Sequence, residues 1–226
     1  MRAHGDSKVG PDGDLRWEAF ADDLLAVIDH LDLDRPIGIG HSKGGAALLL
    51  AEERRPGTFR GLWCWEPVIM PLAPSSGGPV DGNPLARSAL NRRDTFDSFD
   101  AALENFASKP TMQAFHPQAL EAYVRHGFSS GTDGSVHLKC RPENEAQVYQ
   151  MARHHQAWAS LGTVTYPVVI ARGALGTGGP AAMAGPVAER LPHGRLEPHD
   201  ELGHFGPMED PDAIAASIQA FAATCT

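Results

Sequence analysis

The sequence predicts an α/β fold in which a parallel sheet carries helices on both faces and a helical cap interrupts the chain. Two observations support this. Short apolar, partly β-branched runs alternate with helical patterns near both ends of the chain, and strand–helix–strand units of this kind form right-handed crossovers. The middle of the chain shows helical spacing without a strong strand, which is most simply a cap inserted between two strands.

The first seventy residues predict a helix, a strand, a second helix and a second strand. Apolar residues recur at helical spacing from Trp17 to Leu33, with Asp14 as the expected N-cap. Ile37–Gly40 is a short apolar run with a β-branched bias, and we expect it to be a buried strand. A helix is expected from Gly44 to about Arg54, and Leu62–Trp65 is the next expected strand.

The alternating pattern returns after residue 160. Four further elements are expected there: a strand at Val168–Ala171, a helix around Val187–Leu191, a weak strand at Arg195–Glu197 and a closing helix at Ala213–Ala223. Residues 71–160 begin with a stretch rich in Pro, Gly and Ser and continue with helical spacing. We therefore expect an α/β core from residues 1–70 and 161–226, and a linker and helical cap from residues 71–160.

Composition and charge exclude several classes of protein. The 226 residues carry 19 basic and 28 acidic side chains, a formal net charge of −9, whereas a nucleic-acid binder needs a basic face. No stretch approaches the ~20 apolar residues of a membrane-spanning helix, and residues 1–13 lack the apolar region of a signal peptide. Three scattered cysteines suit a reducing cytoplasm, and no paired Cys/His spacing indicates a metal site.

Residues 40–45, with the sequence GHSKGG, lie where the first expected strand meets the second expected helix. The pattern G-x-S-x-G is typical of a sharp strand-to-helix turn that exposes a serine hydroxyl. Glycines two places to either side of Ser42 allow the backbone to pack closely, and the helix N-terminus favours negative charge that develops nearby. Ser42 is therefore the candidate nucleophile.

A serine hydroxyl needs a base to take its proton before it attacks a carbonyl carbon. His204, in the sequence LGHFGP, is the candidate base because it lies between the last expected strand and the last expected helix. A loop at that place can reach back over the sheet edge at which Ser42 is exposed.

These segments resemble the α/β-hydrolase superfamily, and specifically its cap-bearing serine hydrolases. The matching segments are GHSKGG at residues 40–45, GHF at 203–205, EDP at 209–211 and RAHGDS at 2–7, which resembles the family's R-G-H-G-x-S loop. The resemblance implies that Ser42 is the nucleophile, that His204 is the base and that the amide of Lys43 is one oxyanion donor. It implies a small-molecule substrate and no cofactor.

The chain departs from the family pattern at the triad acid. The family usually carries this acid after the strand that precedes the last crossover, but residues 173–179 contain no carboxylate. Glu66 is our candidate because it follows the second expected strand and so emerges at the same sheet edge as Ser42, an arrangement that some family members resemble. Asp200 is the alternative, although it is only four residues from His204 and is expected to share its loop.

A second departure lies at the start of the chain. The family has further strands before the R-G-H-G loop, and the loop after one of them supplies the second oxyanion amide, whereas this chain begins inside the R-G-H-G loop at Met1. We therefore expect an incomplete sheet, which leaves the oligomeric state open.

The expected function is a serine hydrolase that acts on an ester or similar small carbonyl compound through an acyl-enzyme. The alternative is a truncated or degenerate relative that binds a ligand or partner without turnover.

Overall fold

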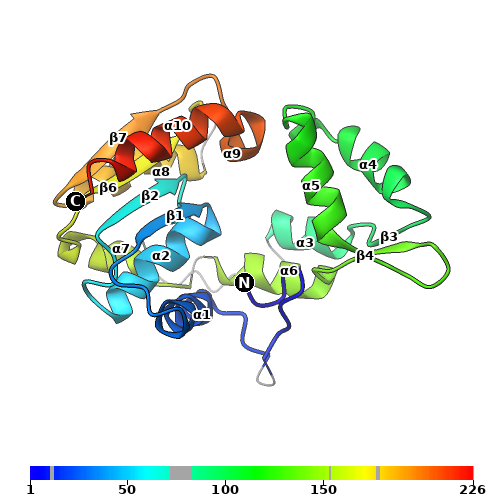
Figure 1. Ribbon diagram of the computed structural model, residues 1–226, viewed down its shortest axis with the longest axis horizontal. Helices are drawn as coiled ribbons and strands as arrows, with labels where there is room; N and C mark the ends of the chain where they lie inside the picture. Colours follow the sequence, from blue (N-terminus) through cyan, green and yellow to red (C-terminus); the bar gives the residue numbers. More distant parts are fainter. Residues whose placement is uncertain (11–12, 72–82, 153, 177–178, 226) are drawn as a thin grey trace. The chain divides into compact units, whose positions relative to one another are not determined.

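The computed structural model describes residues 1–10, 13–71, 83–152, 154–176 and 179–225. These residues form two compact units, most of whose elements are labelled in Figure 1. We call Arg16–Ser76 with Ala152–Thr226 the sheet unit, and Met1–Leu15 with Gly77–Met151 the helical unit. All the candidate site residues lie in the sheet unit: Ser42, Lys43, Glu66, Asp200 and His204.

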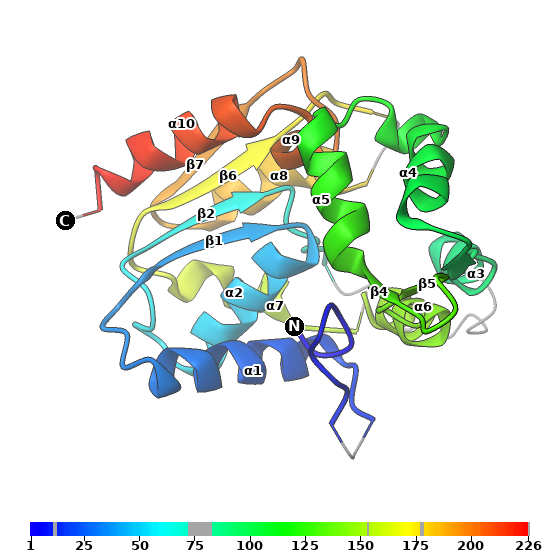
Figure 2. The ribbon, with the colours of Figure 1, turned by 45° about the vertical axis from the view of Figure 1, so that its right-hand side comes forward.

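A four-stranded parallel sheet forms the centre of the sheet unit. Its strands lie side by side in the order β1-β2-β6-β7 (Figure 2). They are β1 (Ile37–His41), β2 (Gly61–Trp65), β6 (Val168–Arg172) and β7 (Gly194–Pro198). All three pairings are parallel, so the carboxyl ends of the strands meet at one edge of the sheet. The four strands expected from the sequence are confirmed, each to within one residue at either end.

Helices cover both faces of this sheet, as the sequence predicts. On one face, Trp63 belongs to the apolar cluster that packs under α10 (Pro211–Ala222). On the other face, α2 (Lys43–Arg54) approaches so closely that a Cβ on Gly38 would lie 2.7 Å from a methyl carbon of Leu48. Figure 1 shows β1 and β2 between these two helices.

The other helical elements of the sheet unit differ in detail from the expected ones. They are α1 (Trp17–His30), α7 (Ala157–Ser160), the 3-10 turn η3 (Leu161–Thr163), α8 (Pro180–Arg190) and α9 (Gly206–Glu209). The expected N-cap of α1, Asp14, is wrong, because Arg16 occupies that position and the helix begins at Trp17. Asp14 instead accepts a hydrogen bond of 2.9 Å at its carbonyl oxygen from Arg2. The helix α8 begins earlier than expected, at a proline that suits a first helical turn.

The helical unit contains a small sheet that the sequence does not predict. Its helices are α3 (Pro84–Leu90), α4 (Phe99–Ala107), η2 (Pro110–Met112), α5 (Pro117–Gly127) and α6 (Pro142–Met151). Its antiparallel strands pair in the order β3-β5-β4 and are β3 (Thr95–Phe96), β4 (Phe128–Ser130) and β5 (Val136–Leu138). Strands of two or three residues are too short to show an alternating pattern. The rings of Phe96, Phe106 and Phe128 lie with centroids 5.7 to 6.1 Å apart and form the centre of this unit.

The boundaries of the two units also differ from the expected ones. Residues 1–15 group with the helical unit, in which Asp6 forms an ion pair of 2.8 Å with Lys139. Residues 152–160 group with the sheet unit, in which α7 packs against α2. Most of the expected linker, residues 72–82, lies outside the described residues.

The strand β1 lies at one end of the strand order, so its outer edge has no neighbouring strand among the residues described. The expectation that this strand is buried is wrong for its central residue, because Ile39 is 55% exposed. By contrast, every residue of β2 is buried. An apolar strand edge is therefore exposed on this side of the sheet.

Candidate active site

Ser42 occupies the sharp turn between β1 and α2. Its backbone φ of 53° and ψ of −116° lie outside the regions that residues with a Cβ ordinarily adopt, and strain of this kind is typical of functional turns. The Ser42 N–H donates to the carbonyl oxygen of Trp65 at 2.8 Å, and the Ser42 carbonyl oxygen accepts from the N–H of Val68 at 3.3 Å. The segment thus has the backbone geometry of a nucleophile elbow.

Glycines on both sides of Ser42 make this turn possible. A Cβ on Gly40 would lie 2.6 Å from the backbone nitrogen of Gly45. A Cβ on Gly45 would lie 2.9 Å from the Cβ of Pro67. Side chains at Gly40 and Gly45 would push α2 away from the strands, so the close packing expected for Gly40 has a physical reason, and Gly45, one residue beyond the G-x-S-x-G pattern, has the same one.

Glu66 follows β2 directly, at the same sheet edge as Ser42. Its side chain is 2% exposed, and its φ is 41°. Oε1 accepts a hydrogen bond of 2.8 Å from the N–H of Gly173, the first residue after β6. A Cβ on Gly173 would collide with the carbonyl groups of Leu202 and Gly203. Burial of a carboxylate is energetically costly unless the group is hydrogen-bonded. The Glu66 side chain is thus buried and fixed by a hydrogen bond, and is not a solvent-exposed glutamate at the end of a strand.

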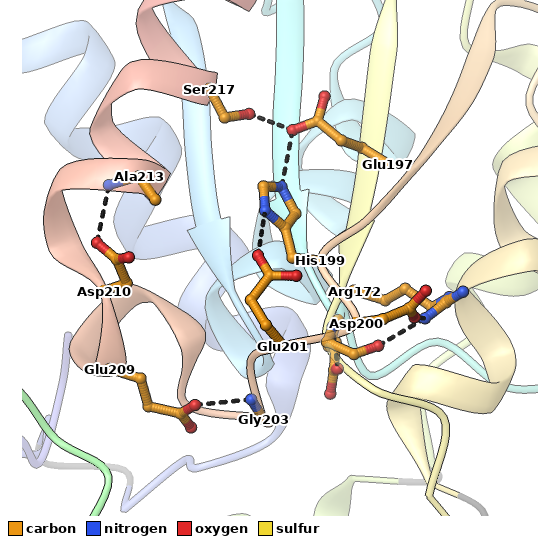
Figure 3. A network of polar contacts seen from close by, with 12 residues as sticks. Arg172, Glu197, His199, Asp200, Glu201, Gly203, Glu209, Asp210, Ala213 and Ser217 are labelled. Atoms are coloured by element: carbon orange, nitrogen blue, oxygen red, sulfur yellow. Dashed lines mark hydrogen bonds and ion pairs between the residues drawn. The ribbon is translucent and has the colours of Figure 1, made fainter.

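His204 is the second partner of Glu66. Its Nδ1 lies 2.6 Å from Oε2 of Glu66. The loop that carries His204 is also held from α9, because the N–H of Gly203 donates to Oε2 of Glu209 at 2.7 Å (Figure 3). The His204 side chain is 34% exposed, so a buried carboxylate supports an imidazole that solvent can reach.

Asp200, the alternative acid, is engaged elsewhere. Its Oδ1 pairs with the guanidinium of Arg172 (Figure 3). The Asp200 side chain is 71% exposed, whereas that of Arg172 is 11% exposed. The geometry therefore brings Glu66, and not Asp200, to His204.

His41, between Gly40 and Ser42, contacts the loop of the candidate base. Its Nε2 lies 2.9 Å from the carbonyl oxygen of His204, and the two imidazole centroids are 4.9 Å apart. Burial, with a smaller effect from His204, lowers the pKa of His41 to about 4. His41 is therefore neutral near pH 7, with the proton on the Nε2 that donates. Nε1 of Trp65 donates to the same carbonyl oxygen at 3.0 Å.

Lys43 is the first residue of α2, directly after Ser42. The amides of a first helical turn point away from the helix, which is the direction that an oxyanion donor requires. The Lys43 ammonium nitrogen lies 4.3 Å from the centre of the Phe20 ring in α1. The side chain of Lys43 thus packs against α1, whereas its backbone amide belongs to the first turn of α2 beside Ser42.

The sequence patterns do not point to four residues of this site: His41, Trp65, Gly173 and Glu209. His41, Trp65 and Gly173 form hydrogen bonds to residues more than 100 positions away. Glu209 bonds the backbone N–H of Gly203, six residues before it. Each of these bonds pairs a side chain with a backbone group, and such bonds leave no motif. One signal exists in retrospect, because His41 and Trp65 each directly precede a candidate residue at the end of a strand.

Other reactive or ligand-binding features are few in the part of the chain that the structure describes. No group of three or more His, Cys, Asp or Glu side chains there is placed to hold a metal ion. Burial raises the pKa of Cys64 to about 12, so this thiol is a poor nucleophile at neutral pH. Within the same residues, none of the helices has both the length and the apolar character needed to cross a membrane.

The fold and the Ser42 turn agree with a comparison against protein families. The Alpha/beta hydrolase family matches residues 1–217. The chain belongs to this family.

Curated relatives match about half of the chain. Type I acyl-CoA thioesterase mpaH' of Penicillium brevicompactum is 31% identical over 128 residues, which are 55% of this chain and 29% of that protein. Type I acyl-CoA thioesterase mpaH of Penicillium roqueforti (strain FM164) is 27% identical over 118 residues, which are 51% of this chain and 27% of that protein. The match thus spans less than a third of either relative.

Solved structures show the same fold over nearly the whole chain. The peroxisomal alpha-beta-hydrolase Lpx1 of Saccharomyces cerevisiae has a TM-score of 0.78 at 21% identity, covering 97% of this chain and 64% of that chain. A thermophilic esterase of Thermogutta terrifontis has a TM-score of 0.72 at 19% identity, covering 100% of this chain and 78% of that chain. At these identities the likeness is one of fold.

Proposed function

We propose that this chain hydrolyses carboxylic esters or thioesters, with Ser42 as nucleophile, His204 as base and Glu66 as acid. The observation that carries the proposal is the 2.6 Å contact between Nδ1 of His204 and Oε2 of the buried Glu66. A carboxylate at this place keeps the imidazole proton on Nδ1, so that Nε2 can accept the serine proton, and it stabilises the imidazolium that forms. The elbow geometry of Ser42 supports the same assignment.

The proposed reaction has two acyl-transfer steps. Ser42 Oγ attacks the carbonyl carbon of the substrate while His204 takes its proton. The tetrahedral oxyanion accepts a hydrogen bond from the Lys43 amide. When the bond to the leaving group breaks, the alcohol or thiol receives the proton from His204 and the acyl group stays on Ser42. Water, deprotonated by the same imidazole, then releases the carboxylic acid and restores Ser42.

The activities of similar proteins support an acyl substrate. The matched relatives are acyl-CoA thioesterases, and one protein of similar fold is an esterase. Ester and thioester hydrolysis use the same sequence of steps and differ in the leaving group. We therefore propose an acyl group carried on an alcohol or a thiol as the substrate class.

A fluorophosphonate probe tests this proposal, because it reacts with an activated serine and with no ordinary hydroxyl. We expect the chain to take the label and to release p-nitrophenol from p-nitrophenyl acetate, and the Ser42→Ala variant to do neither. Ser217→Ala is the matched control, since the Ser217 hydroxyl donates to Glu197, and it should be labelled at the rate of the unaltered chain.

Two outcomes would contradict the proposal. Labelling that persists in Ser42→Ala would remove Ser42 from the role of nucleophile. A folded chain that takes no label and releases no p-nitrophenol would instead favour the alternative, which is binding of a ligand or partner without turnover.

A further inference from the structure

The carbonyl oxygen of His204 accepts two side-chain hydrogen bonds. Nε2 of His41 donates at 2.9 Å, and Nε1 of Trp65 donates at 3.0 Å. Each carbonyl oxygen has two lone pairs, so these two donors use both acceptor positions. The carbonyl group of the candidate base is thus fixed by side chains rather than by secondary structure.

The two donors come from neighbouring strands. His41 ends β1, Trp65 ends β2, and the register of the parallel pairing places them side by side. His41 directly precedes Ser42, and Trp65 directly precedes Glu66. The carbonyl group of His204 is therefore tied to the strand that leads to the proposed nucleophile and to the strand that leads to the proposed acid.

Packing reinforces these hydrogen bonds. Trp65 is fully buried, and a Cβ on Gly206 would overlap its indole ring, so the loop after His204 lies directly on that ring. Tryptophan can only donate through Nε1, and neutral His41 donates through Nε2. Its burial keeps His41 in that neutral form near pH 7.

We infer that His41 and Trp65 are positioning residues, which hold His204 by its own carbonyl oxygen so that its imidazole stays against Glu66. This inference rests on the proposed function. The donors act through His204, because both hydrogen bonds end on its backbone. Without them the loop can turn, and a small rotation is enough to lose the 2.6 Å contact between His204 and Glu66.

Substitutions that remove one hydrogen-bond donor test the inference. His41→Leu removes the donor, His41→Gln keeps an N–H donor, and Trp65→Phe removes the indole N–H while it keeps an aromatic ring. We expect kcat for p-nitrophenyl acetate to fall about tenfold in His41→Leu and in Trp65→Phe, the effect of losing roughly one hydrogen bond. KM should stay within about twofold, and His41→Gln should recover most of the kcat.

The split between kcat and KM separates positioning from a general loss of structure. A partly unfolded variant would lose activity in both parameters, and His41→Gln would not restore it, whereas a misplaced imidazole lowers kcat alone. Trp63→Phe is the matched control, because Trp63 also donates its indole N–H but to Ser217, at 3.1 Å. Its kcat and its KM should be those of the unaltered chain.

A second measurement does not need turnover. In proton NMR, the Nδ1 proton of His204 should resonate far downfield because it lies in a short hydrogen bond to a carboxylate. We expect a sharp signal in the unaltered chain and in Trp63→Phe, and a weaker, exchange-broadened signal in His41→Leu and Trp65→Phe, because there the contact between His204 and Glu66 is made for only part of the time. Folded variants that keep both this signal and the kcat of the unaltered chain would overturn the inference. Failure of the proposed function is seen separately, as an unaltered chain that shows the signal but takes no fluorophosphonate label.

Discussion

Glu66 and His204 are 138 residues apart in the sequence, and Oε2 of Glu66 lies 2.6 Å from Nδ1 of His204. The carboxylate is buried at the end of a strand, and the imidazole reaches it from the loop between β7 and α9. The end of β2 and the loop that carries His204 must therefore both be correctly folded before the contact between Glu66 and His204 can form. Activity should depend on this pair far more than on any other carboxylate of the loop.

Glu66→Gln should lower kcat by about 10⁴-fold, the usual effect of replacing a triad acid by an amide, because the amide favours the wrong imidazole tautomer. Asp200→Asn should change kcat by less than about threefold, since Asp200 pairs with Arg172. Steady-state hydrolysis of p-nitrophenyl acetate measures both. The opposite ranking would transfer the role to Asp200, and small effects in both variants would indicate a Ser–His dyad.

His41 should make the folded state less stable at acidic pH. Its pKa is about 4 in the folded chain and 6.5 when unperturbed. Above pH 6.5 neither state binds the proton, whereas between pH 6.5 and about 4 the unfolded chain binds it and the folded chain does not. The free energy of unfolding should therefore fall as the pH is lowered through this window, by about 3 kcal/mol in total.

Urea titrations at several pH values measure this effect. His41→Gln should show a shallower decline than the unaltered chain, although not a flat one, because burial also lowers the pKa of His155. His30→Gln is the control, since His30 is exposed at the end of α1. Equal slopes in His41→Gln and the unaltered chain would contradict the prediction.

Gly40→Ala should destabilise the fold by about 1–3 kcal/mol, the typical cost of inserting a methyl group into a packed core. The reason is that the new Cβ would lie 2.6 Å from the backbone nitrogen of Gly45. Gly185→Ala in α8 is the matched control, because nothing lies within 4 Å of its added Cβ, and helix propensity predicts a gain of up to about 1 kcal/mol. Chemical denaturation of both variants measures the difference. A Gly40→Ala variant as stable as the unaltered chain would contradict this prediction, because it would mean that the backbone at Gly40 can move away from Gly45 with no loss in the free energy of unfolding.

The exposed edge of β1 should make the 226-residue chain self-associate. Unpaired apolar edges recruit strands from other copies, and Ile39 is 55% exposed on this strand. Size-exclusion chromatography over a range of concentrations should show an apparent mass that rises with concentration. Ile39→Lys should shift the chain toward the monomer, since charged side chains protect strand edges. A chain that remains monomeric at the highest concentration would refute this prediction.

Much of the sheet unit can be predicted because its signals are local. Runs such as Val168–Ala171 are apolar on both sides of the strand, which is typical of a buried parallel sheet, and the glycines around Ser42 are a compact motif. Glu66 can also be predicted, because its position at a strand end places it at a known edge of the sheet. These inferences need only the order of the elements and the direction of each strand.

The rest depends on contacts that the sequence does not reveal. The antiparallel strands of the helical unit are only two or three residues long, so pairing rather than pattern defines them. The grouping of residues 1–15 with the helical unit comes with an ion pair between Asp6 and Lys139. The roles that we infer for His41 and Trp65 depend on where one carbonyl oxygen lies. None of these features has a periodicity or a motif of its own.

Gly173 restricts which substitutions this site can accept during evolution. Its N–H supports the Glu66 carboxylate, and the carbonyl groups of Leu202 and Gly203 leave no room for a side chain at that position. A mutation at residue 173 would thus weaken the support of the proposed acid, Glu66, before another carboxylate could replace it. Descendants that inherit glutamate at position 66 should therefore also inherit glycine at position 173, and the two positions should be gained or lost together along a lineage.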